Sequence, residues 1–180
     1  MNLKEYFAAQ AVAASNLDEE KISEFARVLG KLRESNATLW IAGNGGSAAT
    51  ASHAVADFTK TSTSNGHAPV KAIALSELLS LTTAFSNDVS FEASLGESLA
   101  LLSSPGDALL IITVSGLSPN LRYAADVAKR IGIPVYSLTG SRGHQMIENS
   151  TLGILVESND YQIVENIHLE IIHWLVKALS

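Results

Sequence analysis

The sequence contains no cysteine and few basic residues. Without cysteine the chain has no disulfide bond, no thiolate metal site and no cysteine nucleophile. Its 12 lysines and arginines face 18 aspartates and glutamates, for a net charge of −6, and the basic residues form no cluster. Binding along a nucleic acid requires a basic patch or stripe that neutralises phosphates. We therefore predict that nucleic acid is not a partner of this protein.

Long apolar runs are also missing. No window approaches the ~18 consecutive apolar residues of a membrane-spanning helix. The N-terminal residues include Lys4 and Glu5 and then a short apolar stretch. They lack the basic start and the ~7 to 15 uninterrupted apolar residues of a secretory signal. These features predict a soluble, cytoplasmic protein with no membrane partner.

The chain does contain enough apolar residues for one sizeable core, and many hydroxyl groups. Its 180 residues, 47% of them hydrophobic and 17% charged, fit a single folded domain over residues 1–180. The 22 serines and 10 threonines outnumber the basic residues by more than two to one. If the protein binds an anion, hydroxyls and backbone amides are therefore the expected ligands.

Five short apolar segments alternate with stretches long enough for helices, which predicts an α/β fold. Parallel strands that are covered on both faces form continuous apolar runs. Right-handed crossovers between such strands produce a doubly wound, three-layer, flavodoxin-like sheet. The predicted five-stranded parallel sheet consists of residues 38–42, 70–75, 108–113, 133–139 and 152–156.

Helices are predicted at both ends of the chain. Apolar residues at spacings of three to five mark residues 1–35 as helical, with a new helix beginning between Asn16 and Asp18. Residues 162–179 are apolar almost all the way round, and such a helix is buried on more than one side. We predict that the N- and C-terminal helices form an oligomeric helical layer packed against other subunits. The alternative is that the last helix lies in a groove of its own monomer.

Ligands of doubly wound sheets bind at the carboxyl ends of the strands, so the loops there are the candidate site. Residues 43–48 (GNGGSA) match the dinucleotide pattern G-x-G-x-x-G/A. The acidic residue that would hold a ribose hydroxyl, Glu77, lies about ten residues too late, so no nucleotide cofactor is expected. The loop is better interpreted as an anion site, in which backbone N–H groups, Asn44, Gly45 and the Ser47 hydroxyl lie at a helix N-terminus.

A second hydroxyl-rich loop, residues 113–120 (TVSGLSPN), follows the most apolar strand. Ser118 before Pro119 is typical of a helix N-cap followed by proline at the first helical position. No lysine or arginine occurs in residues 72–121. Three hydroxyls of this loop are therefore candidates to hold one oxyanion in front of the helix dipole: Thr113, Ser115 and Ser118.

Four segments, in order along the chain, form a specific combination of motifs. They are GNGGSAATASHAVADFTK (43–60), TVSGLSPN (113–120), SLTG (137–140) and ENIHLEIIH (165–173). These motifs resemble the sugar isomerase (SIS) domain, and more narrowly the phosphoheptose isomerases, which convert sedoheptulose 7-phosphate to a mannoheptose 7-phosphate. The resemblance implies a homotetramer with active sites shared between subunits. It also implies a sugar phosphate held by Ser47, Thr113, Ser115 and Ser118.

The resemblance further implies a zinc site. In phosphoheptose isomerases a histidine, a glutamate four residues later, a glutamine on the last helix and a histidine eight residues beyond it bind the metal, and the glutamate and last histidine are the acid/base pair. His53 and His173 match this pattern, whereas Asp57 stands in place of the glutamate and Glu165 in place of the glutamine. Glu165 is therefore either a replacement base or a second anionic ligand.

The spacing of these four residues is compatible with one metal site. His53 and Asp57 are four residues apart on a predicted helix, so they project from one face, which we expect at the carboxyl edge of the sheet. Glu165 and His173 lie about two turns apart and ~80° out of line, so they would meet only from the flanks of one site. Two imidazoles and two carboxylates suit zinc. The alternative is that both histidines are buried, hydrogen-bonded core residues. His168, between Glu165 and His173, is expected to face elsewhere and to be structural.

Two further features are candidates for substrate contacts. Asp88 is either a ligand of a sugar hydroxyl or an ordinary residue at a helix end. The polar loop 60–69 is a candidate lid, in which Lys60 is either solvated or reaches a phosphate or hydroxyl. The predicted function is that of a phosphosugar isomerase acting through an enediol. The candidate catalytic residues are Asp57, Glu165 and His173. The altered carboxylates favour the alternative of a non-catalytic SIS module that binds a sugar phosphate in a regulatory or scaffolding role.

Overall fold

A computed structural model describes all 180 residues and contains one sheet of five parallel strands. The spatial order β2-β1-β3-β4-β5 is the flavodoxin-like order. The strands after β2 are added on the other side of β1, so the order reverses between β1 and β3. The predicted doubly wound sheet is therefore confirmed, and three of its strands have the expected bounds. The strands are β1 (Thr38–Ala42), β2 (Lys71–Ala74), β3 (Ala108–Thr113), β4 (Val135–Gly140) and β5 (Leu152–Val156).

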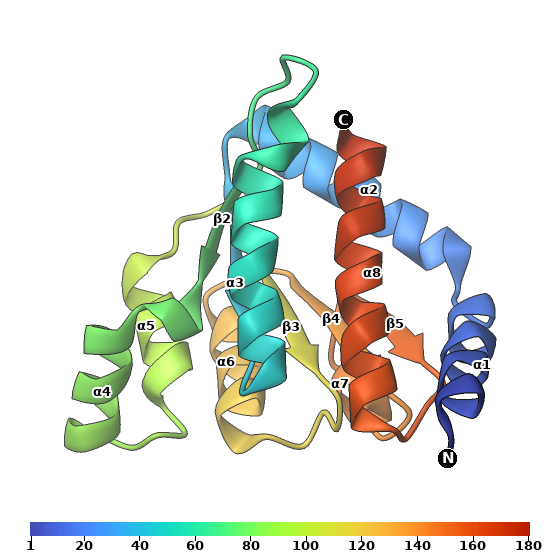
Figure 1. Ribbon diagram of the computed structural model, residues 1–180. Helices are drawn as coiled ribbons and strands as arrows, with labels where there is room; N and C mark the ends of the chain where they lie inside the picture. Colours follow the sequence, from blue (N-terminus) through green and yellow to red (C-terminus); the bar gives the residue numbers. More distant parts are fainter.

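Eight α-helices cover the two faces of the sheet and complete the three layers (Figure 1). One core, with Phe25 and Phe58, lies under α1, α2, α3 and α8, and the other, with Leu99 and Leu121, lies under α5, α6 and α7. Side chains of β1 alternate between the two cores. The helices are α1 (Leu3–Ser15), α2 (Glu19–Ser35), α3 (Gly46–Thr59), α4 (Leu79–Asp88), α5 (Ser94–Leu102), α6 (Pro119–Arg130), α7 (His144–Glu148) and α8 (Tyr161–Leu179), with short 3-10 helices η1 (Thr61–Thr63) and η2 (Leu75–Glu77).

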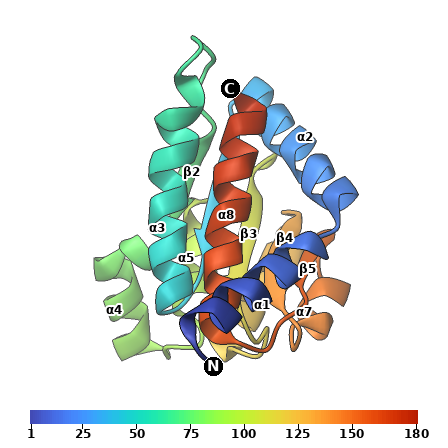
Figure 2. The same cartoon turned by 45° about the vertical axis from the view of Figure 1, so that its right-hand side comes forward.

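The break between the first two helices occurs where the sequence predicts it. Asp18 is the N-cap of α2, and its carboxylate accepts a hydrogen bond from the backbone N–H of Lys21 at 3.1 Å. Glu19 and Glu20 follow in the first turn, where the helix dipole favours acidic side chains. The turn before Asp18 allows α1 and α2 to lie at different places along α8 (Figure 2).

The last helix, α8, is buried mainly by its own chain. It lies between α3 and α2, with α1 crossing near its N-terminal end (Figure 2). Ile163, Ile167 and Ile172 are buried there, whereas Trp174 is exposed. The alternative of a helix in a groove of its own monomer therefore accounts for most of its apolar surface, and packing against other subunits stays a prediction. No helix of the chain, α8 included, is long and apolar enough to cross a membrane.

The polar loop 60–69 lies at the far end of α3 from the glycine-rich loop (Figure 1). The 14 residues of α3 span ~21 Å, and the loop beyond them contacts the C-terminus, where the Asn65 side-chain amide donates a hydrogen bond to the Ser180 carbonyl at 3.0 Å. The expectation that this loop forms a lid over the carboxyl edge of the sheet is therefore wrong within one chain. Lys60 does not reach the carboxyl edge of the sheet, because helix length separates them.

His168 is fully buried on α8, as its expected structural role requires. Neither of its ring nitrogens has a hydrogen-bond partner of regular geometry. Burial lowers the pKa of His168 from 6.5 to about 4, and the backbone of Thr139 opposes this effect. The folded protein therefore holds the imidazole in its neutral form.

We expect His168 to lower the free energy of unfolding by about 2 kcal/mol between pH 7.5 and pH 5. The unfolded imidazole takes up a proton as the pH falls below 6.5, whereas the folded one stays neutral down to about pH 4. Its contribution is thus complete above pH 6.5 and is lost as the pH falls towards 4. Urea unfolding at several pH values measures the change. His168→Asn should flatten the slope and His67→Asn should not; equal slopes in wild type and His168→Asn would contradict the prediction.

Candidate active site

The glycine-rich loop after β1 is a tight turn that leads directly into α3. A Cβ on Gly43 would overlap the main chain of Ser47, and Gly45 has a φ of 54°, so both positions require glycine. Gly45 is the N-cap of α3 and supplies no side-chain cap. The first-turn N–H groups of α3 and the Ser47 side chain therefore lie where an anion is favoured.

The loop after β3 holds its hydroxyls by hydrogen bonds from its own backbone. The Thr113 hydroxyl oxygen accepts from the Gly116 N–H at 3.2 Å, and that of Ser115 accepts from the Leu117 N–H at 3.2 Å. Each hydroxyl keeps its own proton to donate. Ser118 is the N-cap of α6 with Pro119 at N1, as predicted, but its hydroxyl makes no capping hydrogen bond. All three hydroxyls of this loop therefore remain available as donors to an oxyanion.

The two loops are joined by a pair of asparagine side chains. The amide nitrogen of Asn44 donates to the carbonyl oxygen of Asn120 at 2.9 Å, and the amide nitrogen of Asn120 donates back at 2.9 Å. Asn120 is 2% exposed. Asn44 thus positions the loops relative to each other. Asn120 is not predicted as a site residue, because its burial and its contact with Asn44, 76 residues away in the sequence, depend on the tertiary structure.

Together these loops line a cavity of about 140 Å³ at the carboxyl edge of the sheet. A cavity of this volume is large enough to admit a phosphoryl group. We call it the phosphate cavity. Asp88 does not line it; this residue ends α4, where it is exposed and accepts a hydrogen bond from Asn87. The polar lining consists of Asn44, Ser47, Thr113, Ser115, Ser118, Tyr161 and Glu165.

Glu165 lies in the phosphate cavity and not at the metal group. A Cβ on Gly46 would overlap both of its carboxylate oxygens, so the carboxylate rests on the first turn of α3. The positive end of the helix dipole stabilises a negative charge there. Our expectation that Glu165 and His173 meet at one metal site is not met, because the side chains of α8 at these positions contact different turns of α3.

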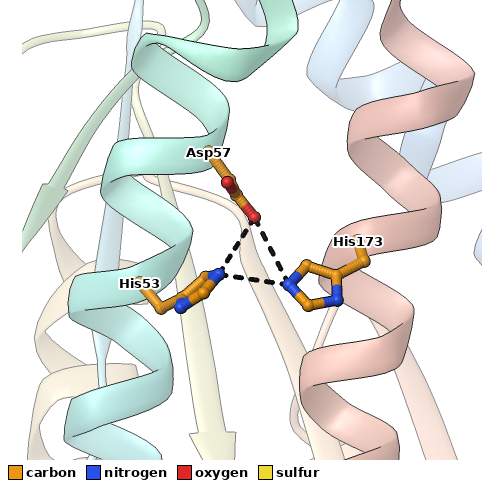
Figure 3. A group of neighbouring side chains, drawn as sticks. All are labelled: His53, Asp57 and His173. Carbon is orange, nitrogen blue, oxygen red and sulfur yellow. Dashed lines mark hydrogen bonds and ion pairs between the residues drawn. The ribbon is translucent and has the colours of Figure 1, made fainter.

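Three of the four expected metal-binding residues do come together, between α3 and α8 (Figure 3). The two Nε2 atoms of His53 and His173 are 3.1 Å apart, and Oδ2 of Asp57 lies 3.3 Å from the first and 3.7 Å from the second. Both histidine side chains are 48% exposed, so the alternative of buried core histidines is wrong. We call these residues the His-Asp-His group.

The His-Asp-His group lies away from the carboxyl edge of the sheet, further along α3 and α8. His53 is six residues beyond Ser47 on α3, which places it ~9 Å further along the helix axis. Asp57 lies one turn further still, and its other carboxylate oxygen accepts a hydrogen bond from the Thr61 hydroxyl at 3.1 Å. Thr61 was not identified from the sequence, although it is four residues from Asp57 and so lies on the same side of the chain.

The geometry of the His-Asp-His group fits a metal ion. Two ligand atoms that bind tetrahedral zinc at ~2.0–2.1 Å lie ~3.3 Å apart. The three separations measured here are 3.1, 3.3 and 3.7 Å. Three protein ligands with a fourth position open to water or substrate are typical of catalytic zinc sites.

Comparisons with known proteins agree with this architecture. Residues 5–140 match the family model of the SIS domain. A probable phosphoheptose isomerase of Thermoplasma acidophilum is 35% identical over 187 aligned residues, which cover 100% of this chain and 98% of the relative. The phosphoheptose isomerase of Campylobacter concisus is 36% identical over 140 residues, 78% of this chain and 74% of its own.

Two solved structures have the same fold over nearly the whole chain. A phosphoheptose isomerase from Francisella tularensis superposes with a TM-score of 0.90 at 26% identity, covering 98% of this chain and 95% of that one. The phosphoheptose isomerase from Neisseria gonorrhoeae superposes with a TM-score of 0.88 at 25% identity, covering 98% and 96%. The chain therefore belongs to the SIS domain family, in the group that contains the phosphoheptose isomerases.

Proposed function

We propose that this protein is a phosphosugar isomerase that interconverts sedoheptulose 7-phosphate and a mannoheptose 7-phosphate. The observation that carries the proposal is the separation between the phosphate cavity and the His-Asp-His group. From Ser47 to His53 the rise along α3 is ~9 Å, and from Glu165 to His173 the rise along α8 is ~12 Å. Six C–C bonds of ~1.5 Å span roughly 8 Å when extended. A seven-carbon sugar held by its phosphate would place C1 and C2 near the His-Asp-His group.

Neutral donors would hold the phosphate. The hydroxyls of Thr113, Ser115 and Ser118 surround one end of the cavity at the N-terminus of α6, and no basic side chain lines it. In a small, partly enclosed site such oriented dipoles stabilise an anion. These donors carry no net charge. A protein with a net negative charge can therefore still bind an anion at the point where their dipoles converge.

The reaction requires a base that moves a proton between C1 and C2 through an enediol. Asp57 is our candidate, because it is the carboxylate of the group: its Oδ2 lies 3.3 and 3.7 Å from the two histidine Nε2 atoms, and Thr61 donates a hydrogen bond to its other oxygen. His173 is the second acid/base candidate, as the resemblance to the phosphoheptose isomerases implies. Glu165 lies at the phosphate end, so we assign it no proton transfer. Aspartate is one methylene shorter than the glutamate of the family pattern, and a base must come within ~2.6–3.2 Å of the proton.

Zinc is the metal that we propose for the His-Asp-His group. His53, Asp57 and His173 would hold it, and when bound it would polarise the carbonyl oxygen of the sugar. Glu165 would not be a ligand. The donor set of two imidazoles and one carboxylate also suits other divalent transition metals, so the metal content identifies the ion.

We also propose that the chain assembles as a homotetramer. Apolar side chains that are more than half exposed lie on α1 and around α4, and such surface is typical of interfaces. Asp88, outside the cavity of its own chain, would then contribute only to the site of a neighbouring subunit. A cytoplasmic location stays a prediction from the sequence. The exposed apolar residues on α1 and around α4 are Leu3, Phe7, Val12, Leu79, Val89 and Phe91.

The first test is turnover. Zinc-loaded protein incubated with sedoheptulose 7-phosphate should produce aldose signals in the NMR spectrum, and Asp57→Asn should lower kcat by about 100-fold or more, because it removes the base. His67→Asn, in the exposed loop, should leave kcat unchanged. If the protein binds ketose phosphates but turns none of them over, the isomerase proposal is wrong and the non-catalytic module is favoured. Activity that appears only in the double variant Asp57→Glu, Glu165→Gln would identify a lost reaction.

The second test is metal content. Protein purified without added metal should contain about one zinc per subunit by elemental analysis. His53→Ala and His173→Ala should each lose the metal, whereas His144→Ala should retain it. Thr61→Val should weaken zinc binding by about tenfold, because it removes the hydrogen bond that orients Asp57. Equal zinc content in wild type and His173→Ala would contradict the proposed site.

The third test concerns the charge in the phosphate cavity. Glu165→Gln should tighten the binding of inorganic phosphate by about three- to tenfold in calorimetry, because it removes a nearby negative charge. Glu170→Gln is the matched control on the same helix, where its carboxylate is exposed and bonds to Gln10. Phosphate affinity that is unchanged or weaker in Glu165→Gln would place the anion elsewhere.

A further inference from the structure

The guanidinium group of Arg122 contacts the loop after β3 but does not line the phosphate cavity. Nε of Arg122 donates a hydrogen bond to the backbone carbonyl of Gly116 at 3.1 Å. Nη2 of the same side chain donates to the Oε1 atom of Gln145 on α7 at 2.5 Å. Arg122 therefore ties the loop after β3 to a helix that takes no part in the cavity, and it does so without lining the cavity itself.

The position of Arg122 is unfavourable for its helix. It is the fourth residue of α6, whose first turn contains no acidic residue. The positive end of a helix dipole disfavours a cation, and the preferred place for one is the last turn, where Lys129 and Arg130 lie. Arg122 also forms no ion pair with a carboxylate.

The hydrogen bond from Arg122 sets the direction of one peptide group. A carbonyl and the N–H of the next residue point in opposite directions, so drawing the Gly116 carbonyl outward turns the Leu117 N–H inward, to the hydroxyl oxygen of Ser115. Gly116 has a φ of 66°, and a Cβ there would come within 2.8 Å of the Gly143 Cα. The loop is thus held between the guanidinium on one side and Gly143 on the other.

Without this hold, the Gly116 carbonyl would be free to turn toward the cavity. A carbonyl oxygen facing a phosphate is repulsive, and the Ser115 hydroxyl would lose the N–H that fixes its lone pair and directs its proton. The guanidinium prevents both changes and places a positive charge one peptide group behind the anion. No other basic residue occurs from residue 72 to residue 121.

We propose that Arg122 is the positioning residue of the phosphate loop, which sets the affinity for the phosphate of the substrate without contacting it. The inference rests on the proposed function and assigns its phosphate affinity to a residue outside the cavity. Because the phosphate is bound equally in ground state and transition state, the effect belongs in KM and not in kcat.

Calorimetry with inorganic phosphate and steady-state kinetics with sedoheptulose 7-phosphate test the proposal on the zinc-loaded protein. Arg122→Ala should weaken phosphate binding and raise KM by about tenfold each, with kcat within about twofold of wild type. Arg122→Lys keeps the positive charge but loses the planar guanidinium with its two donors, so we expect phosphate affinity to fall by about threefold. Lys129→Ala is the matched control: its ammonium lies on the same helix and bonds to Asn149.

Gln145→Ala keeps the test valid if Arg122→Ala fails to fold. It leaves the guanidinium in place and removes only its outer anchor, and it should raise KM by about two- to fourfold with kcat unchanged. The inference, but not the proposed function, is overturned if both Arg122 variants bind phosphate within twofold of wild type. It is also overturned if kcat falls by the same factor as KM rises. A wild type that neither binds phosphate nor turns over a ketose phosphate overturns the proposed function, and the inference with it.

Discussion

The packing of α3 against α8 is the constraint on which the rest of the site depends. Both helices start at the carboxyl edge of the sheet and run in the same direction (Figure 1). The side of α3 at this contact carries Gly46, which touches Glu165, and His53 and Asp57, which face His173. As a result Glu165 rests on the first turn of α3, and His173 meets His53 two turns further along.

Charge is arranged around the phosphate cavity in an unusual way for an anion site. A carboxylate, Glu165, lies inside it, and the guanidinium of Arg122 contacts its loop without lining it. Between them the hydroxyls and peptide groups of the two loops form the wall. Helix N-termini stabilise negative charge by oriented N–H groups, which have no net charge. An acidic chain can therefore form an anion site without basic side chains. In the proposed phosphate site, affinity would depend on loop geometry more than on ionic attraction.

The fold and the loops of the site were predictable because they depend on local patterns. Apolar runs of five or six residues located β1, β3 and β5 correctly, since strands buried on both faces carry no polar interruption. The glycine-rich turn and the Ser-Pro helix start marked the two loops, because glycine at positive φ and proline at N1 have few other uses. Both loops follow strands at the point where the chain order reverses, which places them side by side.

The sequence by itself determined the sheet, the two loops and the residue types that carry the chemistry. Only the tertiary structure decided which of these residues meet. Spacing on one helix says which residues share a face but not how far along that face the neighbouring helix presents its own side chains. For this reason Glu165 was expected beside His173 and lies instead on Gly46, and Lys60, close in sequence, is a helix length away. Arg122 and Asn120 became visible only when the loops were brought together, because their partners are distant in sequence.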